Sequence, residues 1–377
     1  MEELQDPERG GEILTLEVKQ RKWWISVFFC GFLIFTGDSL VMLLLNFYYV
    51  QDKRSESDQN RQYRGTWTQA LLQNAAFPIL IPLFFLFPSP KQKAEPVSSD
   101  PPPFLRVLSL YVSLGVLVSV HSKLYALAKL YVGWGILVST QLILTSLFLA
   151  FINRLKFNRW IIVSITFTLA SDFFGSPEFS GAPDEDESYT YGIKAWLILI
   201  FPTLAFSLSL SLMQLGFEKV LVKTKRYGDK KVFRMVLEMQ IVVSFIAALI
   251  CLVGLFASGE FKELNGDSVR FKKGEGYYGL SLVGLAISWQ VWAVGLLGLV
   301  LLVSGVFADV VHMCASPVVA LLVVLAFDFK DDEFGWQRRG ALLGSVLALA
   351  SYSYSLYKTK KKDVEELNKR ELNNSEA

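Results

Sequence analysis

Hydrophobic residues along this chain gather into long runs that are separated by short polar or charged stretches. The run from Trp23 to Phe47 holds one acidic residue in 25 positions, and the run from Tyr277 to Phe307 holds no charged residue. An α-helix needs about 20 apolar residues to cross the hydrocarbon core of a bilayer. Runs of this length predict a membrane protein built from transmembrane helices.

Ten such runs can be delimited by charged residues, prolines or glycine clusters, and we expect each to form one transmembrane helix. They lie near residues 23–47, 67–88, 104–122, 130–152, 159–175, 193–216, 234–257, 277–302, 308–328 and 338–357. The third and fourth are poorly separated, and a few residues around Phe307 join the eighth to the ninth. The predicted fold class is an all-α integral membrane protein with ten transmembrane helices.

Composition agrees with this class and argues against several others. The chain is 52% hydrophobic and 19% charged, whereas soluble proteins are about 45–50% apolar and about 25% charged. A net charge of +2 gives no indication of nucleic-acid binding. Cys30, Cys251 and Cys314 fall inside hydrophobic runs at unrelated spacings, which argues against a disulfide framework or a metal site. The sequence also lacks a phosphate-binding glycine loop and a Ser-His-Asp pattern, so we expect no enzyme activity and no cofactor.

Basic residues indicate which side of the membrane the termini occupy. An even number of spans places both termini on one side, and Lys and Arg are enriched in cytosolic loops. With cytosolic termini, 23 of the 37 Lys and Arg residues face the cytosol and the acidic segment 176–189 faces outward. We therefore expect cytosolic tails at 1–22 and 358–377 on either side of a transporter domain at 23–357.

The even number of spans also permits an internal repeat. Five spans in each half, at 23–190 and 191–357, would give the second half the opposite orientation in the membrane. Transporters commonly bind substrate between two such inverted halves. A 5+5 inverted repeat is therefore expected, although the similarity between the halves is too weak to demonstrate it from one sequence.

Ionisable residues inside the spans are candidates for proton coupling, because a charge at the centre of a membrane helix costs about 2.5–3.5 kcal/mol on insertion scales. Asp38 lies about two-thirds of the way along the first span. Glu238 lies near the start of the seventh span, where a pair with Arg234 is the plainer interpretation. His121 and His312 could act as proton relays, but a lone histidine near a helix end is more often simply hydrogen-bonded.

Amides and aromatic residues within the spans indicate the kind of ligand. The amides that we select as substrate-binding candidates are Gln73, Asn74, Gln141 and Gln290. Interhelical hydrogen bonds are the structural alternative. The aromatic candidates are Phe77, Trp289 and Trp292, for which packing against a neighbouring helix is the alternative. Several amides with few fixed charges suit a neutral, planar ligand that both donates and accepts hydrogen bonds.

The second half carries strings that resemble the plant purine permease family, within the drug/metabolite transporter superfamily. In order, they are SLSLSLMQLGFEKVLVKTK, VGLFASGEFKEL, FKKGEGYY, ISWQVWAVGLLGLV and SYSYSLY. The resemblance implies a ten-helix, inverted-repeat carrier that imports adenine-like nucleobases, cytokinins and related purine derivatives, driven by protons. The chain departs from the family pattern at Gly37-Asp38, where the family tends to have Gly-Gln.

Taken together, these features predict a proton-coupled, alternating-access importer of purine-type small molecules in the plasma membrane. Its partners would be the purine-type substrate, protons and the lipid bilayer, without nucleic acid. The alternatives are a carrier of another metabolite, such as an alkaloid or glycoside, and a non-transporting membrane sensor or scaffold on the same fold.

Overall fold

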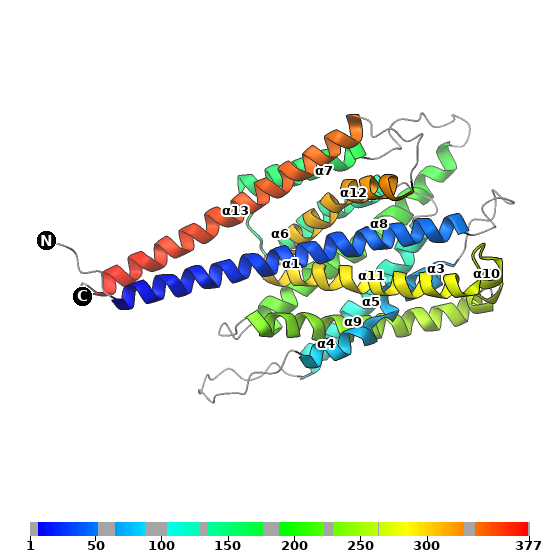
Figure 1. Cartoon of the computed structure of the whole chain (residues 1–377), viewed down its shortest axis with the longest axis horizontal. Helices are drawn as coiled ribbons and strands as arrows, with labels where there is room; N and C mark the ends of the chain where they lie inside the picture. Colours follow the sequence, from blue (N-terminus) through cyan, green and yellow to red (C-terminus); the bar gives the residue numbers. More distant parts are fainter. Residues whose placement is uncertain are drawn as a thin grey trace.

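The computed structural model describes residues 7–51, 65–86, 104–128, 134–175, 188–221, 229–262, 264–327 and 336–375. These residues are mostly helical, and the long helices run along the long axis of the molecule (Figure 1). In chain order the elements are α1 (Pro7–Gln51), α3 (Thr66–Ala75), the 3-10 helix Phe77–Ile79, α4 (Leu80–Leu86), α5 (Phe104–Ala128), α6 (Trp134–Phe151), α7 (Arg159–Gly175), α8 (Ser188–Leu215), the π-helix Gly216–Leu221, α9 (Asp229–Ser258), the 3-10 helix Glu260–Lys262, α10 (Leu264–Arg270), α11 (Glu275–Leu302), α12 (Gly305–Phe327) and α13 (Trp336–Ser375).

Each of the ten expected segments coincides with a helix, except that the second is divided. Pro78 has no backbone N–H to continue a helical ladder, and α3 accordingly ends at Ala75 before α4 begins at Leu80. Among the described residues, six helical segments are long and apolar enough to cross a membrane: Gln20–Leu45, Thr66–Leu86, Phe104–Ala128, Ile200–Lys219, Phe233–Ser258 and Glu275–Leu302. The all-helical membrane fold is confirmed, whereas ten crossings and the inverted repeat stay predictions.

The outward faces of the helices carry large apolar side chains. Phe28 and Phe32 on α1 are 69% and 65% exposed, and Leu280 on α11 is 68% exposed. Soluble proteins rarely expose contiguous apolar patches of this kind. A surface of this composition is the one expected of helices that face lipid.

The start of the first helix and the end of the last helix approach each other at one end of the molecule. α1 begins and α13 ends at the same end of the bundle (Figure 1), where Lys360 Nζ lies 4.9 Å from the centre of the Trp23 ring. The expected tails are therefore helical over residues 7–22 and 358–375. Most of the acidic segment, residues 176–187, lies outside the described residues.

The tightest packing in the bundle joins α1 to α11 through glycines. A Cβ added to Gly37 would lie 2.6 Å from the backbone nitrogen of Trp292, and one added to Gly295 would lie 2.7 Å from the carbonyl oxygen of Cys30. Small residues of this kind allow two membrane helices to approach closely. Because α1 and α11 lie in different halves of the sequence, the halves interlock rather than forming separate units.

Candidate substrate-binding site

A cavity, which we call the inner cavity, lies between α3, α5, α8, α9 and α11 and has an empty volume of about 660 Å³. Its polar lining consists of Gln73, Asn74, His121, Ser122, Ser209, Gln240 and Ser244. Its apolar lining consists of Val118, Phe206, Leu210, Met213, Val243, Trp289, Trp292, Ala293, Leu296 and Leu297. Of the seven predicted substrate-binding residues, Gln73, Asn74, Trp289 and Trp292 line this cavity.

Gln290, between the two tryptophans, is bonded to the protein rather than lining the cavity. Its Oε1 accepts a hydrogen bond from Gln240 Nε2 at 3.1 Å, and its Nε2 donates to the carbonyl oxygen of Gln73 at 3.0 Å. The side chain is only 2% exposed. Gln290 thus links α11 to α9 and α3, and it fixes two residues that do line the cavity. Its direct contact with a ligand stays a prediction.

Two of the three amides that line the inner cavity, Asn74 and Gln240, present acceptors to a ligand, whereas the side chain of Gln73 can donate as well as accept. Asn74 Nδ2 donates to the carbonyl oxygen of Ala70 at 3.1 Å and to Ser122 Oγ at 3.2 Å. Gln240 Nε2 donates to Ser244 Oγ at 2.9 Å as well as to Gln290. Both NH₂ groups are therefore occupied, while the carbonyl oxygens of Asn74 and Gln240 accept no hydrogen bond from the part of the chain that is described.

His121 adds a third acceptor and part of the aromatic wall. Its Nδ1 lies 3.0 Å from the carbonyl oxygen of Pro202 on α8. Because a carbonyl oxygen only accepts, Nδ1 carries the proton, and Nε2 of the neutral ring is then an acceptor. The ring centre lies 5.0 Å from that of Phe206, which is in turn 6.3 Å from that of Trp292.

Asp38, the first proton-coupling candidate, reaches the cavity wall through His312 on α12. Trp292 Nε1 donates a hydrogen bond to His312 Nδ1 at 3.1 Å, and Asp38 Oδ2 lies 3.6 Å from the same nitrogen. An indole N–H only donates, so Nδ1 acts as an acceptor towards Trp292. That nitrogen cannot accept from the indole and donate to the carboxylate at once.

Sequence reasoning missed Asp309, a carboxyl that is fully buried in α12. Gln141 Nε2 donates to Asp309 Oδ1 at 2.8 Å, whereas Oδ2 has no hydrogen-bond partner among the described residues. Gln141, a predicted substrate-binding residue, is therefore occupied by Asp309 and lines neither of the two pockets described here. The signal that could have found Asp309 is its spacing of three from His312, which puts both on one helix face.

Two further candidates lie away from the inner cavity. The Phe77 ring packs edge-on against Phe245, with ring centres 5.6 Å apart, and Phe245 is 47% exposed. The Glu238 side chain is exposed on α9, one turn from Arg234. Neither residue lines the inner cavity, so a role for either in binding or coupling stays a prediction.

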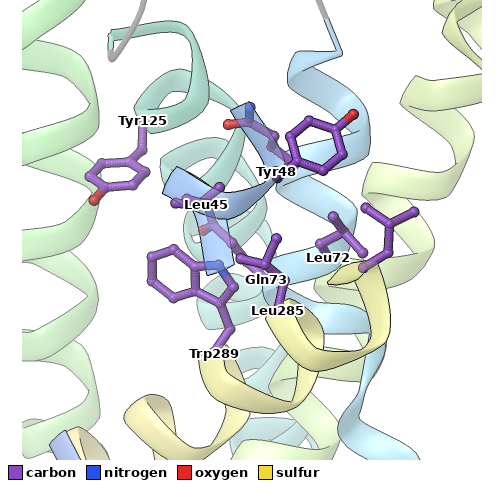
Figure 2. Close-up of a pocket in the computed structure, with 9 residues that line it drawn as sticks. Leu45, Tyr48, Leu72, Gln73, Tyr125, Leu285 and Trp289 are labelled. Carbon is purple, nitrogen blue, oxygen red and sulfur yellow. The ribbon is translucent and has the colours of Figure 1, made fainter. Parts of the chain in front are cut away.

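A second pocket, which we call the outer pocket, adjoins the inner cavity on the side away from the termini. It has an empty volume of about 420 Å³ and is lined by Leu45, Tyr48, Gln69, Leu72, Gln73, Tyr125, Leu282, Leu285 and Trp289. In Figure 2 the Trp289 indole rises from α11 beside Leu45, and the Gln73 side chain reaches in from α3 between Leu45 and Leu285. Gln73 and Trp289 are the two residues common to the linings of both pockets.

A bundle of lipid-facing helices that encloses an amide- and aromatic-lined cavity has the architecture of a membrane carrier for a small, uncharged ligand. Comparison with known proteins agrees. A family profile described as purine nucleobase transmembrane transport matches residues 25–362. Probable purine permease 16 of Arabidopsis thaliana is 79% identical over 100% of both chains, and Probable purine permease 18 is 66% identical over 95% of this chain and 92% of its own length. Purine permease 14 of the same plant is 36% identical, covering 90% and 88%.

The chain belongs to the purine permease family of plant membrane transporters. It is a transporter rather than an enzyme, and its substrate is a purine-type small molecule.

Proposed function

We propose that this protein imports adenine-type purines through the inner cavity by alternating access, and that an inward proton gradient drives the import. Family membership supports the purine substrate, and the acceptor-rich lining of the inner cavity supports an amino-substituted purine in particular. The single observation that carries this choice is that both Asn74 and Gln240 use their NH₂ groups within the protein and leave their carbonyl oxygens for the ligand.

The hydrogen-bonding pattern of the ligand follows from that lining. Adenine offers donors at its exocyclic amino group and at a ring N–H, which complement the acceptors of Asn74, Gln240 and His121. Hypoxanthine has an oxygen in place of the amino group and would face these acceptors with another acceptor. A buried polar group left unpaired costs about 1–3 kcal/mol, so adenine should bind about 5- to 150-fold more tightly than hypoxanthine.

The remaining lining suits the faces and substituents of a purine. Trp289, Trp292 and Phe206 provide aromatic surfaces, and a base–aromatic stack contributes about 1–3 kcal/mol. The apolar end at Leu210 and Met213 would accept an alkyl substituent on the amino group, as in cytokinins. These contacts make Trp292 the central ring of the site, because its indole N–H also binds His312.

Proton coupling would act through the nitrogen that Trp292 and Asp38 share. When a proton binds between Asp38 Oδ2 and His312 Nδ1, these two atoms can form a hydrogen bond with each other. The indole of Trp292 then loses its acceptor and is free to reorient in the cavity wall. The proton and the indole of Trp292, which would contact the substrate, thus compete for one nitrogen, His312 Nδ1. This competition would couple proton binding to substrate binding.

The test is uptake of labelled adenine into proteoliposomes, with and without an inward proton gradient. The Asp38→Asn variant keeps the shape of the side chain but cannot titrate. We expect it to lose proton-driven accumulation and to retain adenine exchange across preloaded membranes. The matched control is Glu238→Gln, the same chemical change at an exposed acid outside the cavity, which should accumulate adenine normally.

Three outcomes would contradict parts of this proposal. Accumulation against a gradient by Asp38→Asn would remove Asp38 from coupling, and equal loss in the control would shift the assignment to Glu238. Failure of the unaltered protein to move adenine would refute the substrate.

The orientation and location of the protein are part of the same proposal. Cytosolic termini and residence in the plasma membrane would make the outer pocket the entrance from outside. A C-terminal tag should be protected from protease on intact cells and become accessible after permeabilisation. Cleavage of the tag on intact cells would reverse the orientation.

A further inference from the structure

We propose that the outer pocket is a second, weaker binding site for the same class of flat purine-type heterocycle, which the ligand occupies before it passes Trp289 into the inner cavity. This inference rests on the proposed function of the inner cavity. It goes beyond that function because it predicts two ligands per protein chain rather than one.

The chemistry of the outer pocket repeats that of the inner cavity on a smaller scale. Tyr125 and Trp289 provide aromatic surfaces (Figure 2), and Gln69 and Gln73 provide amides. Tyr48 adds a third aromatic ring, and the rest of the lining consists of leucines. The pocket has no ionisable side chain other than the two tyrosines, so it suits an uncharged ring.

The side chain of Gln73 connects the two pockets chemically. Its backbone carbonyl is held by Gln290 at 3.0 Å, but its side-chain amide makes no hydrogen bond with the described residues. Gln69 and Gln73 are four residues apart on α3 and so share a helix face, about 6 Å apart along the axis. Gln69 lines the outer pocket, Gln73 lines both, and Asn74 lines the inner cavity. A ligand edge could therefore remain bonded to an amide along the whole passage.

The partition between the pockets is a single indole. The Trp289 ring meets Tyr125 at 87° with centres 6.2 Å apart, and meets Trp292 at 89° with centres 5.5 Å apart. Edge-to-face contacts of this kind are favourable but individually weak. The barrier at Trp289 is thus strong enough to separate two sites and weak enough for a side-chain rotation to open it.

The wall that carries the amides is fixed, which distinguishes the outer pocket from a packing defect. Glu260 Oε2 accepts a hydrogen bond from the backbone N–H of Trp67 at 2.9 Å, at the first turn of α3. Lys123 Nζ lies 3.7 Å from Glu260 Oε1 and 4.3 Å from the centre of the Trp67 ring. These contacts tie α3 to α5 and to the segment after α9. The face of α3 that presents Gln69 is held in place before any ligand arrives.

The experiment is equilibrium binding of labelled adenine to the full-length protein in lipid nanodiscs. We expect about two adenine molecules per chain with distinct affinities. Leu72→Trp fills the outer pocket and should leave one molecule bound, at the tighter site. Ala293→Phe fills the inner cavity and should leave only the weaker site. The control Leu83→Trp makes the same substitution on the lipid-facing surface of α4 and should still bind two.

The possible results distinguish a failure of the second binding site from a failure of the proposed function. One bound adenine that Leu72→Trp leaves intact and Ala293→Phe abolishes would overturn the second site and leave the proposed function standing. No binding by the unaltered protein would refute the proposed function and this inference with it. If Leu72→Trp does not yield folded protein, Leu282→Trp fills the same pocket from α11 and carries the same expectations.

Discussion

Substituting Gly295 by alanine tests whether the close approach of α1 and α11 supports the whole site. The added Cβ would lie 2.7 Å from the carbonyl oxygen of Cys30 and 2.9 Å from the backbone nitrogen of Ile34, whereas ordinary contacts begin at 3.4 Å. The shortfall of about 0.7 Å involves backbone atoms, which cannot rotate away. The two helices must therefore separate.

The expected cost can be isolated with a matched control. Overpacking a closely packed interface typically costs about 1–3 kcal/mol, and replacing glycine by alanine within a helix gains up to about 1 kcal/mol. Gly279 lies on the same helix as Gly295, and Gly31 lies on α1. A Cβ added to either glycine would have nothing within 4 Å. Gly279→Ala and Gly31→Ala should therefore be neutral or slightly stabilising, and the difference between Gly295→Ala and these controls should be about 1–3 kcal/mol.

The measurements are thermal unfolding of the purified variants and adenine uptake in proteoliposomes. Gly295→Ala should unfold several degrees below the Gly279→Ala control, and it should transport more slowly because α11 carries Trp289 and Trp292 while α1 carries Asp38. The same melting temperature for both variants would show that the α1–α11 interface is loose, and would remove the geometric basis of the link between Asp38 and the cavity.

Two further substitutions and one competition experiment probe the polar contacts. Gln141→Leu leaves both carboxyl oxygens of Asp309 unpaired and should lower the free energy of unfolding by about 1–3 kcal/mol. The double variant Gln141→Leu with Asp309→Leu should recover most of this loss of stability. A double variant no more stable than Gln141→Leu alone would contradict this account. Glu260→Gln should weaken the attachment of α3 and lower adenine affinity about twofold to tenfold, which corresponds to roughly 0.4–1.4 kcal/mol. Equilibrium binding measures this change, and unchanged affinity would show that the attachment is dispensable. Hypoxanthine should compete with labelled adenine at least about fivefold more weakly than unlabelled adenine does, and equal competition would refute the acceptor-rich description of the site.

The sequence was sufficient for the positions of the helices but not for the partners of the polar residues. A helix needs only a local run of apolar residues, so nine of the ten expected segments each coincide with one helix and the second is divided at Pro78. Gln290 shows the limit, because its partners Gln240 and Gln73 lie 50 and 217 residues away in the chain. Only the packing of α3, α9 and α11 reveals that its amide is already occupied.

Asp309 was missed for a related reason. The sequence places it at the edge of a span, where acids are unremarkable, and the ninth span was expected from residue 308. In the structure α12 begins at Gly305, directly after a turn at Val303 and Ser304 that lies inside the bundle. Four residues beyond that start, Asp309 is fully buried. The depth of a turn within the membrane depends on its neighbours, and a single sequence does not specify them.

The pairing of α1 with α11 also constrains how the protein is made. Gly37 meets Trp292, a residue that is synthesised 255 positions later. At about 5–20 residues per second, α1 waits in the membrane for roughly 13–50 seconds before its partner emerges from the ribosome. During that interval Asp38 and the glycine face of α1 are without the neighbours that bury them in the finished protein. A variant that weakens this contact should therefore reduce the number of molecules that reach the membrane intact, so its yield in cells should fall further than its transport rate per molecule.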